Sequence, residues 1–592
     1  MHSGKPARFG ACLGLALLIL QAAPAAAFTI TDVVNAASRI PSGSPGYGIA
    51  QGAIFVVTGT GVGPDQFQQA SFPLPTSAGL GGVSIKVSVG GTTVDAVMVY
   101  VSSTEVAAIL PSKTPTGTGT VTVANGSDTA TAPITVVASA FGVFTAASSG
   151  SGPALAFNTA ADGTNSANGL TQSAQPDQTL IINGTGLGAI SSDETQSGVT
   201  DVPSASANIT VWVGSAQATV VSAARGTCCT GLDPNFKIPQ GVAGWDVVTV
   251  TVPSGASGCQ VSVAVQTGNV VSNVGTISVS SGGGLCADVS GIDLGALTSL
   301  GGKVKFGLIY LTRISSTSAA VSILIDAGAA AFTQVDLGSN TVQVPTQAIY
   351  SLFGGSAGNC TVVTSRSSGT TPPTTSPGNP GSPGSPGPIA TLLDAGPAIN
   401  VTSPKGTKQM TKQTGGAYAG TFANASSISL VPGMPPITQG GPPFLDAGTL
   451  TADNGGGGAD IGPFSVSLTN PSSVTWTNAD QITSVNRAQG LTVTWSGGDP
   501  SAWVGIAGTA IQIQGGASVY GSFVCVAPST AGQFTVPSYV TLSLPPVAAN
   551  NPAGGTGTLS LSSTIYKFVS IPGVDLTSYF ASSSTGKSVA YQ

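Results

Sequence analysis

The chain has 592 residues, of which 82 are glycine and 40 are proline, and only 7% are charged. This length exceeds what one hydrophobic core serves, so several domains are expected. The 17 basic and 23 acidic residues give a net charge of −6. An acidic chain without basic clusters excludes a nucleic-acid binder or a protein held on anionic membranes.

Residues 1–27 have the parts of a secretion signal. Lys5 and Arg8 precede an apolar run, and small residues precede the expected cleavage ahead of Phe28. Cleavage leaves 15 basic residues against 23 acidic ones, a net charge of about −8. It also removes His2, the single histidine. Without imidazole, the mature chain lacks the usual general base and the commonest metal ligand, and we expect no enzyme, no cofactor and no metal site.

The remaining sequence predicts strands. Apolar residues alternate with polar ones in segments such as residues 83–89 (VSIKVSV) and 248–252 (VTVTV), which are bounded by Gly, Pro, Asn or Ser. Helical periodicity is scarce, and one short helix is expected near residues 292–300. The pattern predicts an all-β fold of tandem Ig-like β-sandwich modules.

An internal repeat supports this organisation. Residues 56–63 (VVTGTGVG) match residues 181–188 (IINGTGLG), and residues 87–90 (VSVG) match residues 211–214 (VWVG). Together with residues 268–273 (GNVVSN), these motifs resemble a repeated module of bacterial secreted proteins, of acidobacterial type. The module is similar to IPT/TIG Ig-like domains and covers about residues 29–280. The resemblance implies an Ig-like fold and brings no catalytic residues, because that family is of unknown function.

We expect six segments along the chain. They are a signal peptide at 1–27, an IPT/TIG-like module at 28–139, a second Ig-like module at 140–280, a third β-rich module at 281–365, a Pro/Gly/Ser linker at 366–388 and a C-terminal β-sandwich unit at 389–592. No segment after the signal is long and apolar enough to be expected in a membrane.

Six cysteines follow the signal, which indicates an oxidising compartment. We expect Cys259 to pair with Cys228 or Cys229, and Cys286 to pair with Cys360. The sixth cysteine, residue 525, lies in an apolar run and is expected to be a buried thiol.

Two segments resemble nucleotide-binding loops without their context. Phosphate binding needs a helix directly after the loop, and no helix pattern follows residues 59–63 (GTGVG) or residues 581–588 (ASSSTGKS). We interpret the first as a tight turn between strands and the second as a coincidence in a Ser-rich tail.

Three aspartates share an Asp-Ala-Gly context after a hydrophobic residue: Asp326, Asp394 and Asp446. Aspartic proteases present paired aspartates in a similar setting, and two carboxylates that share a proton need no histidine. Alanine replaces the hydroxyl residue of those sites, which favours Asx-type turns at all three positions.

A glycine-rich segment between Asp453 and Asp460 offers oxygen ligands of the kind that Ca²⁺ prefers, although its spacing is not that of an EF-hand. The sequence leaves open whether these two aspartates bind calcium.

Two tryptophans are candidates for a ligand surface. Trp212 alternates with Val211 and Val213, so it points to the other face of its strand. There it either stacks on a sugar ring or is covered by the next domain. Trp245, in an insertion of the second repeat, is the other candidate.

The sequence therefore predicts a non-enzymatic secreted or cell-surface protein, in the extracellular space, cell envelope or periplasm, that mediates interaction or adhesion through Ig-like modules. The expected partner is a protein or glycan on a cell surface or matrix. Two alternatives are a carbohydrate-binding protein and a secreted hydrolase that uses aspartates of the C-terminal unit.

Overall fold

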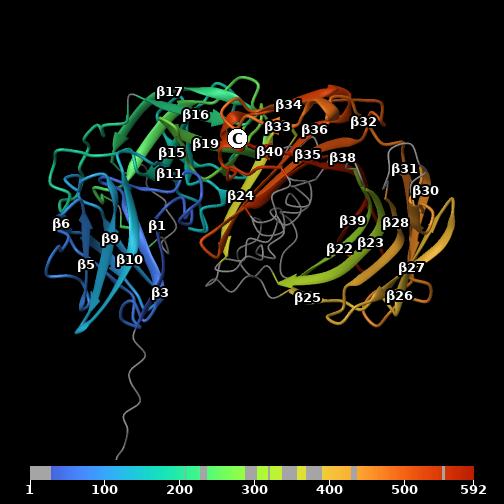
Figure 1. The fold of residues 1–592 in the computed structure, drawn as a ribbon, viewed down its shortest axis with the longest axis horizontal. Coiled ribbons are helices and arrows are strands. Elements are labelled where there is room, and N and C mark those ends of the chain that lie inside the picture. The colour runs from blue at the N-terminus through green and yellow to red at the C-terminus, as the bar shows by residue number, and fades with distance from the viewer. Residues whose placement is uncertain are drawn as a thin grey trace, which may run out of the picture.

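The computed structural model describes residues 28–206, 208–226, 237–239, 241–286, 303–317, 321–336, 357–367, 390–428, 437–549 and 554–592. Over these ranges the fold is all-β and forms tandem β-sandwiches, as predicted (Figure 1). In the part of the chain so described, α-helix is limited to α3 (Ser538–Leu542). The expected signal at 1–27 and the expected helix near 292–300 lie outside the described residues.

The first sandwich has two five-stranded sheets. One contains, in order, β1 (Thr29–Asn35), β3 (Ile54–Thr60), β8 (Glu105–Ile109), β7 (Val97–Val101) and β4 (Gln68–Gln69). The other contains β2 (Ile49–Ala50), β10 (Asp128–Val137), β9 (Gly117–Asn125), β5 (Val83–Val89) and β6 (Thr92–Asp95). The predicted alternation is confirmed in β5, because all four of its apolar side chains are buried between the sheets.

The second sandwich is one eleven-stranded sheet folded over a valine-rich core. Its main path is β12 (Gly152–Pro153), β21 (Gly275–Val279), β19 (Gly258–Thr267), β16 (Ile209–Val213), β17 (Ala216–Arg225), β18 (Asp246–Thr251), β15 (Thr179–Thr185), β13 (Ala156–Thr159) and β14 (Asn165–Ala167), with β11 (Gly142–Val143) on β15 and β20 (Val270–Val271) on β19. The repeated glycine motifs follow equivalent strands, since they begin inside β3 and β15.

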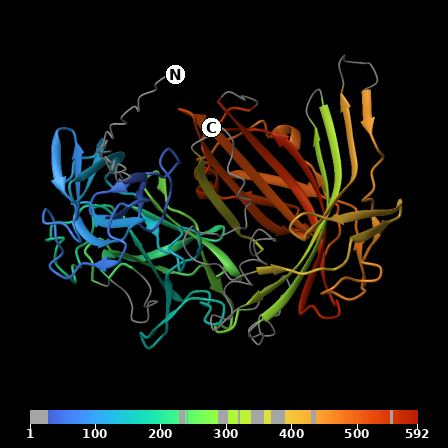
Figure 2. The ribbon, with the colours of Figure 1, turned by 90° about the horizontal axis from the view of Figure 1, so that it is seen from below.

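The C-terminal sandwich is built on a fourteen-stranded sheet (Figure 2). Its main path is β24 (Cys360–Ser367), β36 (Ala517–Pro528), β35 (Trp503–Gln514), β38 (Gly555–Val569), β39 (Leu576–Ser588), β22 (Lys303–Thr317), β23 (Val321–Asp336), β28 (Tyr418–Ile428), β27 (Gly406–Lys412), β26 (Ala398–Ser403), β30 (Gly448–Asp453) and β31 (Ser465–Asn470), with β25 (Ala390–Leu392) on β23 and β29 (Ile437–Gly440) on β28. The smaller elements are β32 (Thr475–Trp476), β34 (Leu491–Ser496) and β37 (Gln533–Val536) in one sheet, β33 (Ser484–Val485) and β40 (Ala590–Tyr591) in another, and the 3-10 turns η1 (Ala479–Gln481) and η2 (Ser529–Ala531).

The strands expected to form a separate third module belong to this large sheet. β22 pairs in parallel with β39, β23 pairs with β28, and β24 pairs with β36. The described strands within residues 281–365 therefore have no sheet of their own, which corrects the expectation of an independent unit there. β24 also extends into the first two residues of the expected linker, whose residues 368–388 lie outside the described ranges.

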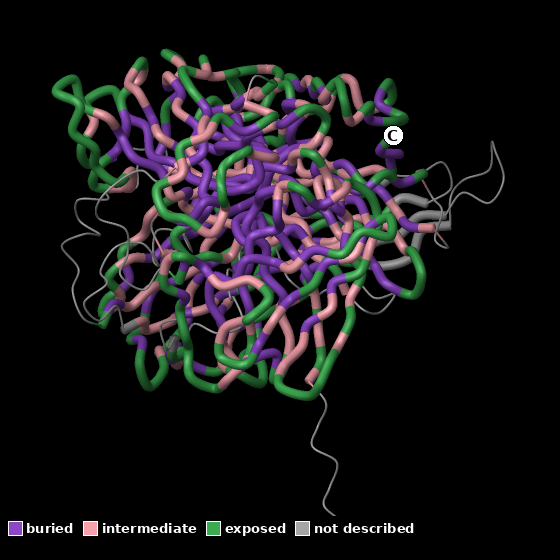
Figure 3. Tube along the Cα trace, turned by 90° about the vertical axis from the view of Figure 1, so that its left-hand side faces the viewer, coloured by how far each residue is buried: buried purple, intermediate pink, exposed green. Residues whose placement is uncertain are grey.

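The three sandwiches share buried residues at their joints. One hydrophobic cluster combines residues of the first sandwich, such as Val34 and Tyr100, with Phe144 and Trp245 of the second. Another combines Val271 of the second sandwich with the C-terminal core. Figure 3 shows the buried positions in the interior of the molecule and the exposed ones at its periphery.

Candidate functional site

Trp245 lies inside the joint between the first and second sandwiches, which corrects its assignment to a ligand surface. Its side chain is fully buried. The indole ring lies 5.0 Å from the ring of Phe144, and its Nε1–H donates to Oδ1 of Asn183 at 2.8 Å. Both the ring and its polar atom are used internally, so neither can contact a sugar.

The same joint contains a buried ion pair of Arg225 and Asp246, which the sequence analysis missed. Both side chains have zero exposure, and Nε of Arg225 lies 3.0 Å from Oδ1 of Asp246, although this contact is not aligned as a hydrogen bond. The guanidinium donates to the carbonyl oxygens of Gly52, Ala243 and Gly188 at 2.6, 2.7 and 2.6 Å. Because Gly52 belongs to the first sandwich, one side chain ties two sandwiches together.

The Asp246 carboxylate is also held by backbone. Its Oδ2 accepts the N–H groups of Gly186 and Leu187 at 2.7 and 2.8 Å. Burial raises the pKa of Asp246, and Arg225 and the two N–H groups oppose that rise. Asp246 is thus a structural anchor of the repeated glycine turn.

Both glutamates of the chain have structural partners. Glu105 accepts hydrogen bonds from the Tyr100 hydroxyl and the Arg39 guanidinium. Burial alone would raise the pKa of Glu105, but Arg39 and Tyr100 hold it below its ordinary value. Glu194 accepts from the N–H and Oγ of Ser112, across the joint, at 2.8 and 2.6 Å. Burial raises the pKa of Glu194, and the hydrogen bonds from Ser112 oppose that rise.

Trp212 lies at the second joint, between the second and C-terminal sandwiches. Its ring is 5.5 Å from the ring of Tyr539, against which it packs while partly buried. The Tyr539 hydroxyl is 2.8 Å from Oγ of Ser262 and donates to the Gly214 carbonyl at 3.1 Å. Burial raises the pKa of Tyr539 to about 12. The structure favours the alternative in which a neighbouring unit covers Trp212.

Asp326 is not in a turn, which corrects the expectation for the first Asp-Ala-Gly copy. It lies inside β23 with a buried side chain, and Arg313 contacts it through Nε and Nη2 at 2.7 and 2.8 Å. Its Oδ2 also accepts the N–H groups of Phe444 and Leu445. Nη2 of Arg313 lies 3.1 Å from Asp446, so a guanidinium binds both carboxylates. A protease dyad needs a shared proton instead.

The pKa of Asp326 makes a testable prediction. Burial alone would raise it, but Arg313 and the two backbone donors hold it below its ordinary value. The carboxylate therefore stabilises the fold above the unfolded pKa of about 3.9, and this contribution is lost as the pH falls through the lower folded pKa. We expect the urea midpoint to fall from about pH 5 to about pH 3 more steeply in the parent than in Asp326→Asn. Parallel curves would contradict this role.

Asp394 forms the predicted turn. Its Oδ1 accepts the N–H of Gly396 at 2.8 Å, and Gly396 has a φ of +110°, which only glycine adopts easily. Lys412 lies 2.9 Å from the same carboxylate oxygen. The turn interpretation is thus confirmed here.

The loop from Asp453 to Asp460 is held by hydrogen bonds to neighbouring segments. Oδ1 of Asp453 accepts from Asn400 at 2.8 Å, and Oδ2 of Asp460 accepts the N–H of Asp394 at 2.8 Å. Asn454, between them, is buried and bonds three backbone groups. Over the described ranges no group of three or more His, Cys, Asp or Glu side chains is placed to hold a metal ion. Calcium binding by these two aspartates stays untested.

Neither of the two segments that resemble nucleotide-binding loops is followed by the helix that phosphate binding requires. Residues 59–63 end β3 in a turn at Gly61, whose φ is +69°, and the next element is the strand β4. Residues 581–588 lie within β39, which is hydrogen-bonded to β22 on one side and β38 on the other. The turn interpretation is confirmed, and the expected Ser-rich tail is instead a central strand.

The disulfides correct the predicted pairing. Cys259 pairs with Cys286, and Cys360 pairs with Cys525, so Cys525 is buried but not a thiol. Cys228 and Cys229 lie outside the described residues.

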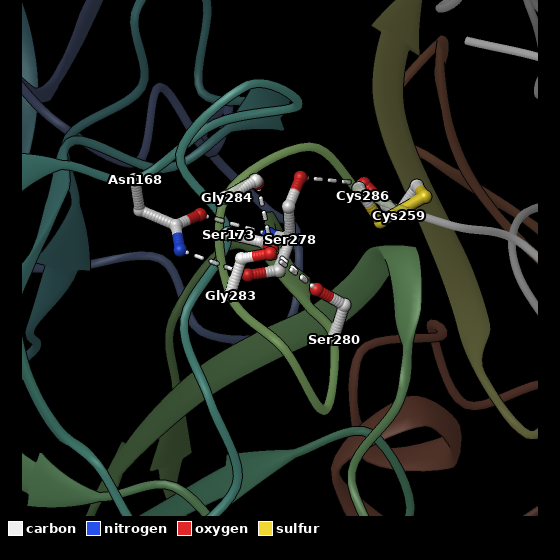
Figure 4. Close-up of a disulfide and its surroundings, with 8 residues drawn as sticks. All are labelled: Asn168, Ser173, Cys259, Ser278, Ser280, Gly283, Gly284 and Cys286. Carbon is white, nitrogen blue, oxygen red and sulfur yellow. Dashed lines mark hydrogen bonds between the residues drawn. A yellow bond between two sulfur atoms is a disulfide. The ribbon is translucent and has the colours of Figure 1, made fainter. Parts of the chain in front are cut away.

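Figure 4 shows the first bridge beside a network of hydroxyl groups. Oγ of Ser278 donates to the Cys259 carbonyl at 2.9 Å, and the Ser173 and Ser280 hydroxyls are 2.6 Å apart. Asn168 bonds the backbone of Ser278 through both atoms of its amide. The network holds the last segment of the second sandwich, residues 278–286, against preceding residues of the same sandwich.

A pocket of about 110 Å³ lies where the three sandwiches meet. Ser38 and Arg39 of the first sandwich, Asn273 of the second and residues 362–364 of β24 contribute to its lining. Arg39 is its ionisable residue, and that guanidinium is already paired with Glu105. The Asn273 amide bonds backbone carbonyls. The pocket is small and lies between the sandwiches, and apolar side chains such as Ile40 and Val271 line it as much as hydroxyl groups do.

The large sheet has one side that faces away from its cores. Apolar side chains on β35, β38 and β22, such as Ile506, Leu559 and Ile309, point to the core side. Alternation places the intervening side chains on the opposite side, which we call the open face. It comprises Thr361, Val363, Ser365 and Ser367 of β24; Ser518, Tyr520, Ser522, Val524 and Val526 of β36; Trp503, Gly505, Ala507, Thr509, Ile511 and Ile513 of β35; Thr556, Thr558, Ser560, Ser562, Thr564, Tyr566 and Phe568 of β38; Leu576, Ser578, Phe580, Ser582, Ser584, Gly586 and Ser588 of β39; Phe306, Leu308, Tyr310, Thr312, Ile314 and Ser316 of β22; and Ile323, Ile325, Ala327, Ala329, Ala331, Thr333 and Val335 of β23.

The open face is uncharged. The described charged side chains of the same seven strands all fall on the other side by alternation: Lys303, Lys305, Arg313, Asp326, Arg366, Lys567 and Lys587. Tyr310, Ile314 and Ile323 are 36%, 45% and 40% exposed, so the face is accessible in part. Six of its side chains are buried: Ser518, Ser522, Val526, Ser578, Phe580 and Ser582. Exposed apolar side chains gathered on one sheet face, as here on β22 and β23, are a feature of interaction surfaces.

Comparisons with known proteins add no function. No family model and no curated protein matches the chain. Among solved structures, domains 5–6 of the S-layer protein SbsC are 14% identical, covering 43% of this chain and 98% of that one, with a TM-score of 0.15. The Bacteroides ovatus mixed-linkage glucan utilization locus SGBP-B, in complex with a mixed-linkage heptasaccharide, is 8% identical (86% and 97% covered, TM-score 0.14). Titin domains A168–A170 are 8% identical (68% and 92%, TM-score 0.12). At such TM-scores these similarities carry no argument.

Over the ranges that the structure describes, no helix is both long and apolar enough to cross a lipid bilayer.

Proposed function

We propose that the protein is a non-enzymatic, exported interaction protein, which presents the open face to a partner on a cell surface or matrix. The observation that carries the proposal is the uncharged face across seven strands, while charged side chains lie on the other side of the same strands. Surfaces that meet no partner ordinarily carry interspersed charges.

The joints support this function because they hold the face in a fixed position. Arg225 bonds the first sandwich to the second, and Tyr539 bonds the C-terminal sandwich to the second. Arg366 of β24 donates to Oγ of Ser42 in the first sandwich at 2.8 Å. Fixed units lose little conformational entropy on binding. The two disulfides among the described residues fit an oxidising compartment outside the cytosol.

The hydrolase alternative has less support. Asp326 and Asp446 meet at Arg313, and Asp394 bonds Lys412 and its own turn. These contacts stabilise ionised carboxylates and do not create the proton-sharing pair that hydrolysis by aspartates requires.

Fractionation and pelleting test the proposal. We expect the chain in the envelope or the medium of producing cells, and we expect purified residues 28–592 to pellet with intact cells, envelope preparations or matrix material. An exported protein of similar acidic pI is the control for nonspecific retention. A cytosolic location with reduced cysteines, or pelleting no better than the control, would contradict the proposed function.

A further inference from the structure

We propose that the open face binds a neutral polysaccharide chain; this inference rests on the proposed function and names the partner of that face. Two features of neighbouring side chains support it, an aromatic row and a field of hydroxyl groups, and both lie on β38, β39 and β22.

The aromatic row crosses three adjacent strands. Strand register places Tyr310 opposite Phe580 and Phe580 opposite Tyr566, with ring centroids 6.3 and 5.6 Å apart. Phe568 is two residues beyond Tyr566 on the same face, and their rings are 5.9 Å apart. Phe580, in the middle of the row, is only 2% exposed. The rings available to a ligand are therefore Tyr310, which is 36% exposed, and the half-buried Tyr566 and Phe568. A partly exposed ring offers a negative π-face to the C–H bonds of a sugar.

Hydroxyl side chains follow the aromatic row directly. The next register position along these strands holds Thr564, Ser582 and Thr312. Oγ1 of Thr564 and Oγ of Ser582 are 2.9 Å apart; Ser582 is buried, and the half-buried Thr564 and Thr312 are the hydroxyls that a ligand can reach. One position further, Oγ of Ser562 reaches a backbone carbonyl only at 3.3 Å. Such groups donate to and accept from sugar hydroxyls without carrying charge.

The composition distinguishes a glycan from other partners. Interfaces between proteins are depleted in serine and alanine and enriched in arginine and aromatic residues. The open face shares the aromatic residues, but it is rich in Ser, Thr and Ala and its described side chains include no arginine. Polyanions and nucleic acids need basic side chains, and the described lysines and arginines of these strands point to the other side. A neutral sugar chain matches a face that is aromatic, hydroxylated and uncharged.

Binding of the full chain to immobilised polysaccharides tests this assignment. The probes are neutral β-1,4-glucan, mannan and xylan, with alginate and heparin as anionic counterparts. We expect binding to at least one neutral probe, insensitive to salt. Tyr310→Ala and Phe568→Ala should each weaken it about tenfold, while Tyr310→Phe, which keeps the ring, should retain it. Phe67→Ala removes a 47% exposed ring from the first sandwich and is the matched control. Equal urea midpoints verify that the variants fold.

Each other outcome overturns the inference. No binding to any neutral probe, tighter binding to alginate or heparin, or equal loss in Phe67→Ala would each refute a glycan site on this face. A dimer that Tyr310→Ala abolishes would assign the face to a second copy. If the chain still pellets with cells or matrix after a negative polysaccharide result, the proposed interaction function stands and only the glycan assignment fails.

Discussion

Replacing Asp246 with asparagine is expected to destabilise the protein by about 3–5 kcal/mol, because it leaves the Arg225 charge buried without its counter-ion. Both side chains have zero exposure, so water cannot replace the lost carboxylate. The guanidinium would keep its bonds to Gly52 and Gly188, which prevents it from turning outward. The joint between the first two sandwiches should therefore open at a lower denaturant concentration.

Urea unfolding followed by tryptophan fluorescence measures this effect, since Trp245 lies in the same joint. Asp95→Asn is the matched control. It breaks the Lys86–Asp95 pair of 2.8 Å, whose side chains are 56% and 36% exposed, and exposed pairs contribute at most about 1 kcal/mol. A similar midpoint in Asp246→Asn and Asp95→Asn would show that the buried pair does not stabilise the joint.

Loss of the Cys360–Cys525 bridge is expected to destabilise the protein more than loss of Cys259–Cys286. The bridges join cysteines 165 and 27 residues apart. Chain-entropy estimates for these separations give about 5 and about 3.5 kcal/mol. The Cys360–Cys525 bridge also fastens β24, the outermost strand of the large sheet, to β36.

Paired serine substitutions at each bridge, compared by urea unfolding without reductant, test this order. We expect the midpoint to fall further in Cys360→Ser/Cys525→Ser than in Cys259→Ser/Cys286→Ser. The reverse order would show that loop length does not govern what these bridges contribute.

The sequence could predict the faces of strands but not their partners. Alternation in β5 gave its buried side correctly, because side-chain direction depends only on local period. It could not show that β22 pairs in parallel with β39, about 270 residues later, since pairing depends on the whole core. For the same reason, the strands of residues 303–336 were assigned to a module of their own.

Residues at the joints were the hardest to predict. Arg225 and Asp246 lie in unremarkable strand sequences, and nothing local indicates that their charges are buried against another sandwich. Trp245 lies in an insertion, where a side chain is expected to be exposed, and nothing local indicates that another sandwich covers it. Cysteine spacing likewise leaves the pairing open, and the true partners are set by the register of β24 on β36.

The open face, in contrast, has a signal in the sequence. In β38, Leu559 and Leu561 alternate with Ser560 and Ser562, although Ser563 then interrupts the apolar side before Ile565. This alternation separates an apolar side from a hydroxylated one. The sequence does not show which strands lie beside β38, because only the fold brings them together into one surface.

Partner binding through the open face is tested most directly by placing a charge on it. Ala329 is exposed on this face, and Val221, 60% exposed on β17, lies on another sandwich. In the pelleting assay with cells and matrix, we expect Ala329→Glu to lose at least about tenfold in retention and Val221→Glu to match the parent. Equal retention of both variants, with folding intact, would contradict an interaction through this face.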